Sequence, residues 1–168
     1  MKSGLTIRED NYSVVLDALK QLSGTDVLVG IPAGPPRDDT PLSNAELGYL
    51  QSTGATVEID GEIVTLPPRP FLDMGIEDSR DKTTVRLKLA AQAALEGNAK
   101  QAEQHLEAAG QIAMDASKAV IEAGDRLTPL SEKTIQKRRE MKPPIPGDKP
   151  LRARGFLFRA IQYVVRKK

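Results

Sequence analysis

The chain has no cysteine, no tryptophan and one histidine, His105, among its 168 residues. The absence of cysteine excludes disulfide bonds, thiolate metal sites and cysteine nucleophiles. A Ser-His-Asp triad or a histidine-ligated metal would depend on His105 alone, and this residue falls on the polar flank of an expected helix. A solvated helix histidine is the simpler interpretation, so we expect no catalytic site, metal or cofactor.

Aromatic residues are also scarce, at 4% of the chain, and hydrophobic residues amount to 39%. The core must therefore be aliphatic and rich in alanine, which favours helix packing. No apolar run approaches the roughly 20 residues of a membrane span, and the first residues lack the apolar stretch of a secretory signal. We expect a single domain over residues 1–168, made in a cytoplasm and without a membrane partner.

The net charge of +1 conceals two opposed parts. Residues 126–168 hold 13 Lys and Arg against three Asp and Glu, whereas residues 1–125 hold 11 basic and 20 acidic residues. A near-neutral total of this kind suggests a protein that meets several charged surfaces, although the basic part is equally explained as a solvated tail.

Hydrophobic periodicity, glycines and prolines divide the chain into short segments. Helices are expected over 11–22, 44–51, 76–96, 99–123 and 132–141, a helical turn within 151–158, and strands over 26–31, 55–59, 62–66 and 161–165. Proline-rich loops occupy 32–43 and 142–150. The order predicts an α+β fold in which a small, mostly antiparallel sheet with a β-hairpin packs against a long helical hairpin and shorter helices.

The clearest local pattern is a pair of alternating runs on either side of Asp60-Gly61. This dipeptide favours a two-residue hairpin turn, because both of its positions need positive φ. The turn would set Val57 opposite Val64 and leave Ile63 on the solvent side.

The two longest helices are expected to pack against each other in antiparallel fashion. In the first, Ile76 and Leu87 lie on the stripe that we expect to be buried; in the second the stripe is mainly alanine, from Ala102 onward. Small side chains allow two helices to approach closely, but they bury little area each.

Three prolines, Pro67, Pro68 and Pro70, lie between the second hairpin strand and the first long helix. They restrict φ, so the chain loses little entropy when it turns there. Phe71 would then anchor the start of the helix. We expect Arg69 to point outward, either toward a carboxylate or backbone carbonyls of a neighbouring molecule or simply into solvent.

The basic segment suggests either nucleic-acid binding or pairing with acidic neighbours in an assembly. The cations that support nucleic-acid binding are Lys133, Lys137, Arg138, Arg139, Lys142, Arg152, Arg154, Arg159, Arg166, Lys167 and Lys168. The candidate interface residues among them are Lys137, Arg138, Arg139, Arg152 and Arg154. No recognition-helix pattern is evident, and we find no aromatic platform interleaved with the charges. DNA contact would therefore be weak and independent of sequence.

Three segments resemble, in order, those of the tail-completion or head–tail joining proteins of tailed bacteriophages, of the minor tail protein Z type. Residues 66–72 are similar to that family's I-P-P-R-P-F element, and residues 44–55, ending near a glycine, precede it as the family's corresponding segment does. Residues 127–139 resemble an L-x-P-L-S-x-x-T-x-x-x-R-R helix. Residues 149–165 resemble a terminal K-P-L-x-x-T-G-x-L-x-x-S-I-x-Y-x-V pattern, with Arg154 and Ala160 in place of Thr and Ser and with Gly155 allowing a tight passage into the last elements.

The resemblance implies a structural virion protein of a long-tailed phage neck, assembled in the host bacterial cytoplasm. Such a protein completes the head-proximal end of the tail and joins it to the head connector, typically as a homo-oligomeric ring. Its partners would be a tail terminator or tail tube and the connector proteins, with room for non-specific contact with DNA in the neck. The expected interface includes Pro35, Pro36 and Arg37 of the first proline-rich loop. The alternative is a small DNA-binding protein that uses the basic C-terminal segment.

The hairpin turn generates the first testable prediction. Replacing Gly61 by valine should lower the stability by about 1 kcal/mol or more, because a β-branched residue is strained at positive φ. Thermal denaturation measures the effect, and an unchanged melting temperature would mean that no tight turn is present.

Overall fold

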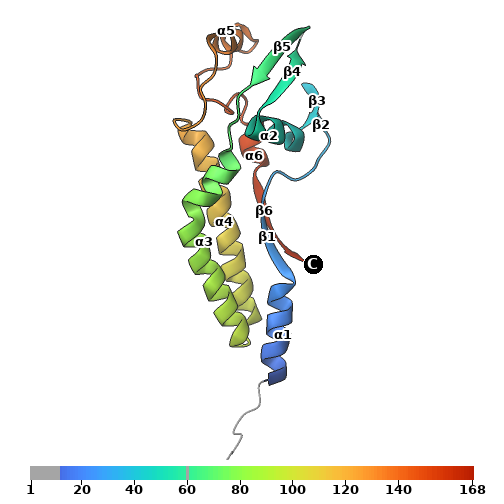
Figure 1. Ribbon diagram of the computed structural model, residues 1–168, viewed down its shortest axis with the longest axis vertical. Helices are drawn as coiled ribbons and strands as arrows, with labels where there is room; N and C mark the ends of the chain where they lie inside the picture. Colours follow the sequence, from blue (N-terminus) through green and yellow to red (C-terminus); the bar gives the residue numbers. More distant parts are fainter. Residues whose placement is uncertain (1–11, 60) are drawn as a thin grey trace, which may run out of the picture.

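A computed structural model of the protein describes residues 12–59 and 61–168 and has an elongated α+β fold (Figure 1). The elements are α1 (Tyr12–Ser23), β1 (Thr25–Gly30), β2 (Pro36–Arg37), β3 (Thr40–Ser43), α2 (Asn44–Thr53), β4 (Ala55–Ile59), β5 (Glu62–Leu66), α3 (Phe71–Leu95), α4 (Ala99–Ala123), α5 (Glu132–Glu140), α6 (Phe156–Ala160) and β6 (Gln162–Lys167). The expected fold class is confirmed. Within the described ranges, no helix has both the length and the apolar character needed to cross a bilayer.

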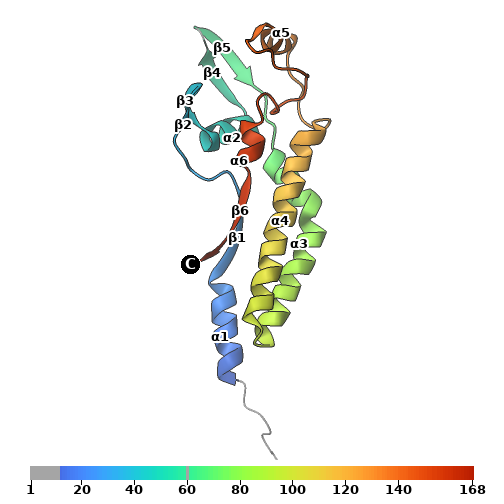
Figure 2. The ribbon, with the colours of Figure 1, turned by 180° about the vertical axis from the view of Figure 1, so that it is seen from behind.

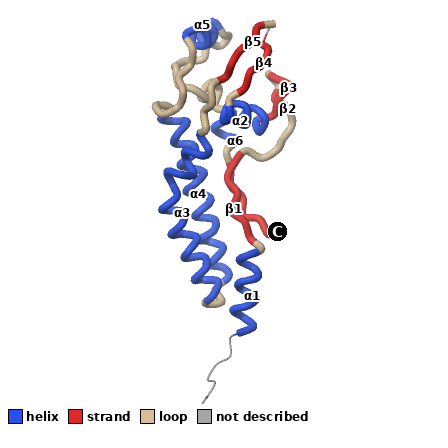
Figure 3. Tube along the Cα trace, in the orientation of Figure 1, coloured by secondary structure: helices blue, strands red, loops and turns tan. Residues whose placement is uncertain are grey.

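The strands form three separate antiparallel ribbons of two strands each, β1–β6, β2–β3 and β4–β5 (Figure 3). The β1–β6 ribbon joins segments from opposite ends of the chain, with pairs running from Thr25↔Lys167 to Gly30↔Gln162. It is the ribbon that lies along the long helices, whereas the other two lie at one end of the molecule (Figure 1).

The β4–β5 hairpin has the expected register, in which Val57 pairs with Val64. Both valines are half-buried, while Ile63 on the opposite face is 80% exposed. Gly61 has φ of +78°, as the turn requires. Asp60 lies outside the described residues.

The long helices α3 and α4 form the expected antiparallel hairpin. Asn98 caps α4 by accepting a hydrogen bond from the Gln101 amide at 3.1 Å, and Gly124 ends the helix at φ +69°. Both features agree with the boundaries expected from the sequence. Cap residues mark helix ends because they satisfy backbone groups that the helix leaves unpaired.

The buried stripe of α3 differs from the expected one. Ile76 and Leu87 are each 45% exposed, whereas the residues turned toward α4 are Gly75, Ser79 and several alanines. A Cβ at Gly75 would lie 2.3 Å from the Cα of Ser117 on α4. The closest approach of the helix pair therefore selects small residues, and the larger apolar side chains of α3 are displaced toward solvent.

A second face of α4 carries the β1–β6 ribbon. At Gly110 a Cβ would lie 2.4 Å from the ring of Tyr163 and 3.1 Å from Val27, so the ribbon rests almost directly on the helix backbone. A hydrogen bond to Glu107 of α4, and then burial, raise the pKa of the Tyr163 phenol. Helix α4 thus lies in the middle of the molecule, in contact with both α3 and the ribbon (Figure 2).

The main core lies at the end of the helical hairpin where α3 begins. Phe71, Ile121 and Ile161 are fully buried there, and Val120, Leu127 and Leu157 complete the cluster. The expectation that Phe71 anchors the start of α3 is confirmed. Gly155 precedes α6 at φ +71°, which matches the tight passage expected at that position.

The α3–α4 seam generates the second prediction. Replacing Gly75 by alanine should lower the free energy of unfolding by about 2 kcal/mol. The clash with the Ser117 backbone, typically 1–3 kcal/mol or more for overpacking, exceeds the roughly 1 kcal/mol that alanine gains in a helix. Urea denaturation measures the change. Gly34→Ala is the control, because a Cβ there meets nothing within 4 Å; equal stability of the two variants would refute the close seam.

Candidate functional site

Arg69 is a buried clamp rather than the outward side chain expected from the sequence. It is 5% exposed. Its Nε donates to the Thr128 carbonyl at 2.7 Å, its Nη2 to the Pro129 carbonyl at 3.1 Å, and its Nη1 to Gln51 Oε1 at 3.1 Å. Burial, and to a lesser extent the charge of Arg138, lower the pKa of its guanidinium.

The clamp joins segments that are far apart in the sequence. The Arg69 amide also donates to the Gln51 carbonyl at 2.8 Å, and the Thr128 hydroxyl donates to the Pro68 carbonyl at 3.2 Å. The proline-rich connection that contains Pro67, Pro68 and Pro70 thus places the Arg69 guanidinium against α2 and the loop before α5. Backbone carbonyls are indeed its partners, but they belong to the same chain.

Arg138 is a second buried guanidinium, at 8% exposed, so it too is no surface contact. Its Nη1 donates to the Lys149 carbonyl at 3.0 Å, and its own carbonyl accepts from the Ile145 amide at 2.9 Å. Burial lowers the pKa of the Arg138 guanidinium, and the negative charge of Asp148 partly offsets this lowering. Arg138 holds the second proline-rich loop against α5, so it is not a cation available to a partner.

The remaining basic candidates are dispersed over the molecule. Lys137 and Arg139 are exposed on α5, at the end of the molecule that carries the β4–β5 hairpin (Figure 1). Lys133 of the same helix binds Glu62 of that hairpin, and this bond, with the charge of Lys133, lowers the pKa of Glu62. Arg152 pairs with Glu122 of α4 at 3.3 Å.

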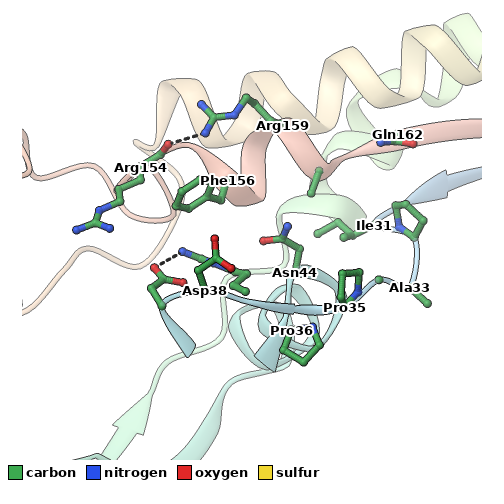
Figure 4. A pocket seen from close by; sticks show the side chains of 15 residues that line it. Ile31, Ala33, Pro35, Pro36, Asp38, Asn44, Arg154, Phe156, Arg159 and Gln162 are labelled. Carbon is green, nitrogen blue, oxygen red and sulfur yellow. Dashed lines mark hydrogen bonds and ion pairs between the residues drawn. The ribbon is translucent and has the colours of Figure 1, made fainter. Parts of the chain in front are cut away.

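Four of the expected interface residues line one hollow of about 640 Å³: Pro35, Pro36, Arg37 and Arg154 (Figure 4). The hollow lies beside the end of the β1–β6 ribbon, where the chain leaves β1 for the first proline-rich loop and where α6 leads into β6. Asn44, Phe156, Arg159 and Gln162 also line it. Tertiary structure therefore brings part of the basic segment to the first proline-rich loop.

Phe156 is the centre of the hollow's cationic wall. The guanidinium of Arg37 lies 4.5 Å from the centroid of its ring, and that of Arg159 lies 5.3 Å from it. Figure 4 shows the ring between Arg159 and the turn at Asp38. The arrangement holds two cations together, since each is attracted by the ring quadrupole.

The three arginines of the hollow differ in what already binds them. Arg37 pairs with Asp39 at 2.6 Å, and Arg159 donates to the Arg154 carbonyl at 3.1 Å. The Arg154 side chain is exposed and forms no hydrogen bond or ion pair with the described residues. Two buried polar atoms of the hollow's lining residues, Arg37 Nε and Asn44 Oδ1, have no hydrogen-bond partner in the described part of the chain.

Sequence reasoning assigned no functional role to Phe156 or Asn44, and it counted Arg159 only as one cation of the basic segment. The available signal was the placement of Phe156 between Arg154 and Arg159. The contact with Arg37 had no sequence signal, because the two residues are more than a hundred positions apart. The hollow offers guanidinium groups, a partly exposed aromatic ring and proline surfaces, which suit a carboxylate with apolar neighbours.

The described residues contain no group of three or more His, Asp and Glu that could hold a metal ion. Comparison of the chain with protein-family models, with curated proteins and with solved structures finds no match.

The Arg69 clamp generates the third prediction. Arg69→Lys should destabilise the protein by about 2–3 kcal/mol, because a compact ammonium cannot serve three separated acceptors in the place of a planar fork. Urea denaturation gives the value, and Arg139→Lys, at an exposed position of α5, is the matched control. A loss below about 0.5 kcal/mol would show that the clamp contributes little to stability.

Proposed function

We propose that the protein is a structural component of a long-tailed phage neck, which completes the head-proximal end of the tail and joins it to the head connector as an oligomeric ring. The observation that carries the proposal is that the three segments with the family resemblance form one unit. Arg69 of the first segment binds the carbonyls of Thr128 and Pro129 in the second. Phe71, Leu127 and Leu157, one from each segment, share the main core.

This convergence gives the resemblance a physical basis. Residues that pack against one another limit each other's possible replacements, even when they are far apart in the sequence. Three weak motifs in the same order are therefore stronger support for a family resemblance when the motifs are in contact. The contacts support a shared scaffold; the neck function follows from the resemblance and is the proposal.

The surface area supports a protein that works in an assembly. The accessible area is 11625 Å², against about 8,100 Å² expected for a compact monomer of this mass. Subtracting about 1,800 Å², an upper bound for eleven residues of any polypeptide, removes the segment outside the described ranges from this comparison. The described part of the subunit is therefore still more open than a compact monomer.

Large apolar side chains contribute to this open surface. They follow α3 and the outer face of the β1–β6 ribbon, where the cross-strand partners Leu28 and Val164 are 41% and 52% exposed. On α3 they are Ile76, Val85, Leu87, Leu89 and Leu95. Such exposure is costly in water and favours association with neighbouring subunits.

The contacts of the basic residues favour this function over general DNA binding. Arg138 is buried, Lys133 and Arg152 bind carboxylates, and Lys168 pairs with Asp26 at 3.0 Å. Several cations that would form a phosphate-binding face are thus engaged within the chain.

Removal of the protein from the phage generates the fourth prediction. Particles made without it should show filled heads separated from tails, or tails of altered length, because the joint between them is incomplete. Electron microscopy of such particles gives the result. Normal infectious particles would contradict the neck function.

Duplex binding by the isolated protein is the accompanying control. Lys137→Gln with Arg139→Gln removes exposed charge from α5 and leaves the buried Arg138 intact. If the neck function is correct, the two changes should leave the weak duplex affinity nearly unaltered. A clear loss of affinity, with a salt slope shallower by about 0.9 for each lost phosphate contact, would favour the DNA-binding alternative.

A further inference from the structure

The hollow beside α6 has an incompletely neutralised cationic wall. Arg37 is paired with Asp39, whereas Arg154 is exposed and Arg159 contacts a backbone carbonyl and the Phe156 ring but no carboxylate among the described residues. Asp38 and Asp39 at the rim keep the local excess of positive charge small. This balance suits a few carboxylates and disfavours a polyphosphate chain.

The outward face of α3 has the complementary chemistry. Asp73, Glu77 and Asp81 follow one another at intervals of four residues, so they lie on one stripe of the helix. All three are exposed, and Glu77 pairs with Arg80 of the same helix at 3.3 Å, so Asp73 and Asp81 are the carboxylates of the stripe without an ion pair among the described residues. Gly75 and Ser79, two positions away from members of the stripe, are buried toward α4, and the carboxylates therefore point away from the molecule.

The carboxylate stripe also has an apolar border. Ile76, which the packing of small residues leaves 45% exposed, adjoins it on the same side of the helix. The hollow offers Pro32, Pro35 and Pro36 and the exposed edge of Phe156. Exposed ion pairs contribute little each, so contact between these apolar surfaces is what would give the pairing affinity.

The two surfaces lie on opposite flanks of the molecule. In Figure 1 and in the reverse view of Figure 2, α3 forms one flank and the chain between β1 and β2 forms the other, with α4 and the β1–β6 ribbon between them. A subunit with complementary patches on opposite flanks cannot satisfy both within itself. It can do so head to tail with copies of itself, and such a heterologous interface closes into a ring when the rotation allows.

We propose that the hollow is a docking site for a second copy of this chain, which inserts the outward face of α3 so that its carboxylates meet Arg154 and Arg159. The inference rests on the proposed ring-forming function and names the contact that builds the ring. The opposite charges of the two parts of the chain act over a longer range, by orienting subunits before the apolar surfaces meet.

The test is the self-association of the full chain, measured by sedimentation velocity over a range of protein and salt concentrations. Wild-type protein should associate, more strongly at low salt. Arg154→Glu, and separately Glu77→Lys with Asp81→Lys, should each weaken association about tenfold at low salt, since attraction becomes repulsion. Neither set alters a buried residue, and circular dichroism verifies the fold.

The combined variant provides the decisive arm. A chain that carries Arg154→Glu together with Glu77→Lys and Asp81→Lys restores opposite charges between these positions in each head-to-tail contact, so it should recover part of the lost association. Lys20→Glu, an exposed position on α1 away from both surfaces, is the control for total charge and should associate as the wild type does.

Three results would overturn the inference: a monomeric wild type at every concentration, unchanged association of the single-sided variants, or no recovery in the combined variant. Loss of duplex DNA affinity in Arg154→Glu with unchanged self-association would instead identify the hollow as a phosphate site. None of these results decides the neck function, which depends on the particles made without the protein.

Discussion

The buried guanidinium of Arg69 joins three parts of the chain that are far apart in the sequence. Its fork binds the loop before α5 and the end of α2, while its own amide is tied to Gln51. Phe71, two residues later, enters the core at full burial. The direction in which α3 leaves the sheet-rich end of the molecule therefore depends on this clamp, and the position of α4 and of the β1–β6 ribbon depends in turn on α3.

Close packing of small residues has a consequence for the surface. The helices approach so closely at Gly75 and Ser117 that larger side chains cannot occupy the seam. Ile76 and Leu87 are therefore displaced to the flanks of α3, where they remain partly exposed. The close approach of α3 and α4 therefore leaves apolar side chains next to the outward carboxylates of α3. The packing of the interior thus determines part of the surface that is available for association.

The basic C-terminal third is a set of different roles and not one patch. Arg138 holds a loop, Arg152 binds Glu122 of α4, and Arg159 stacks on Phe156. Burial of a guanidinium is tolerated only with hydrogen-bond partners, and backbone carbonyls supply them at both Arg69 and Arg138. The net charge of residues 126–168 is positive, which the sequence shows directly. It does not show which of these cations form hydrogen bonds or ion pairs within the chain itself.

Local patterns in the sequence determined the elements of this protein. The alternating runs on either side of Gly61 predicted the hairpin register, and Asn98 and Gly124 predicted the ends of α4. The order of helices and strands predicted the α+β class, because turns, caps and periodicity depend on neighbouring residues. Tertiary structure alone decided the side of α3 that is buried, the inward path of Arg69, and the meeting of Arg37 with Phe156. These outcomes depend on which distant segments pack against each other and on where backbone carbonyls lie close to a buried cation. A local sequence pattern contains no information on either.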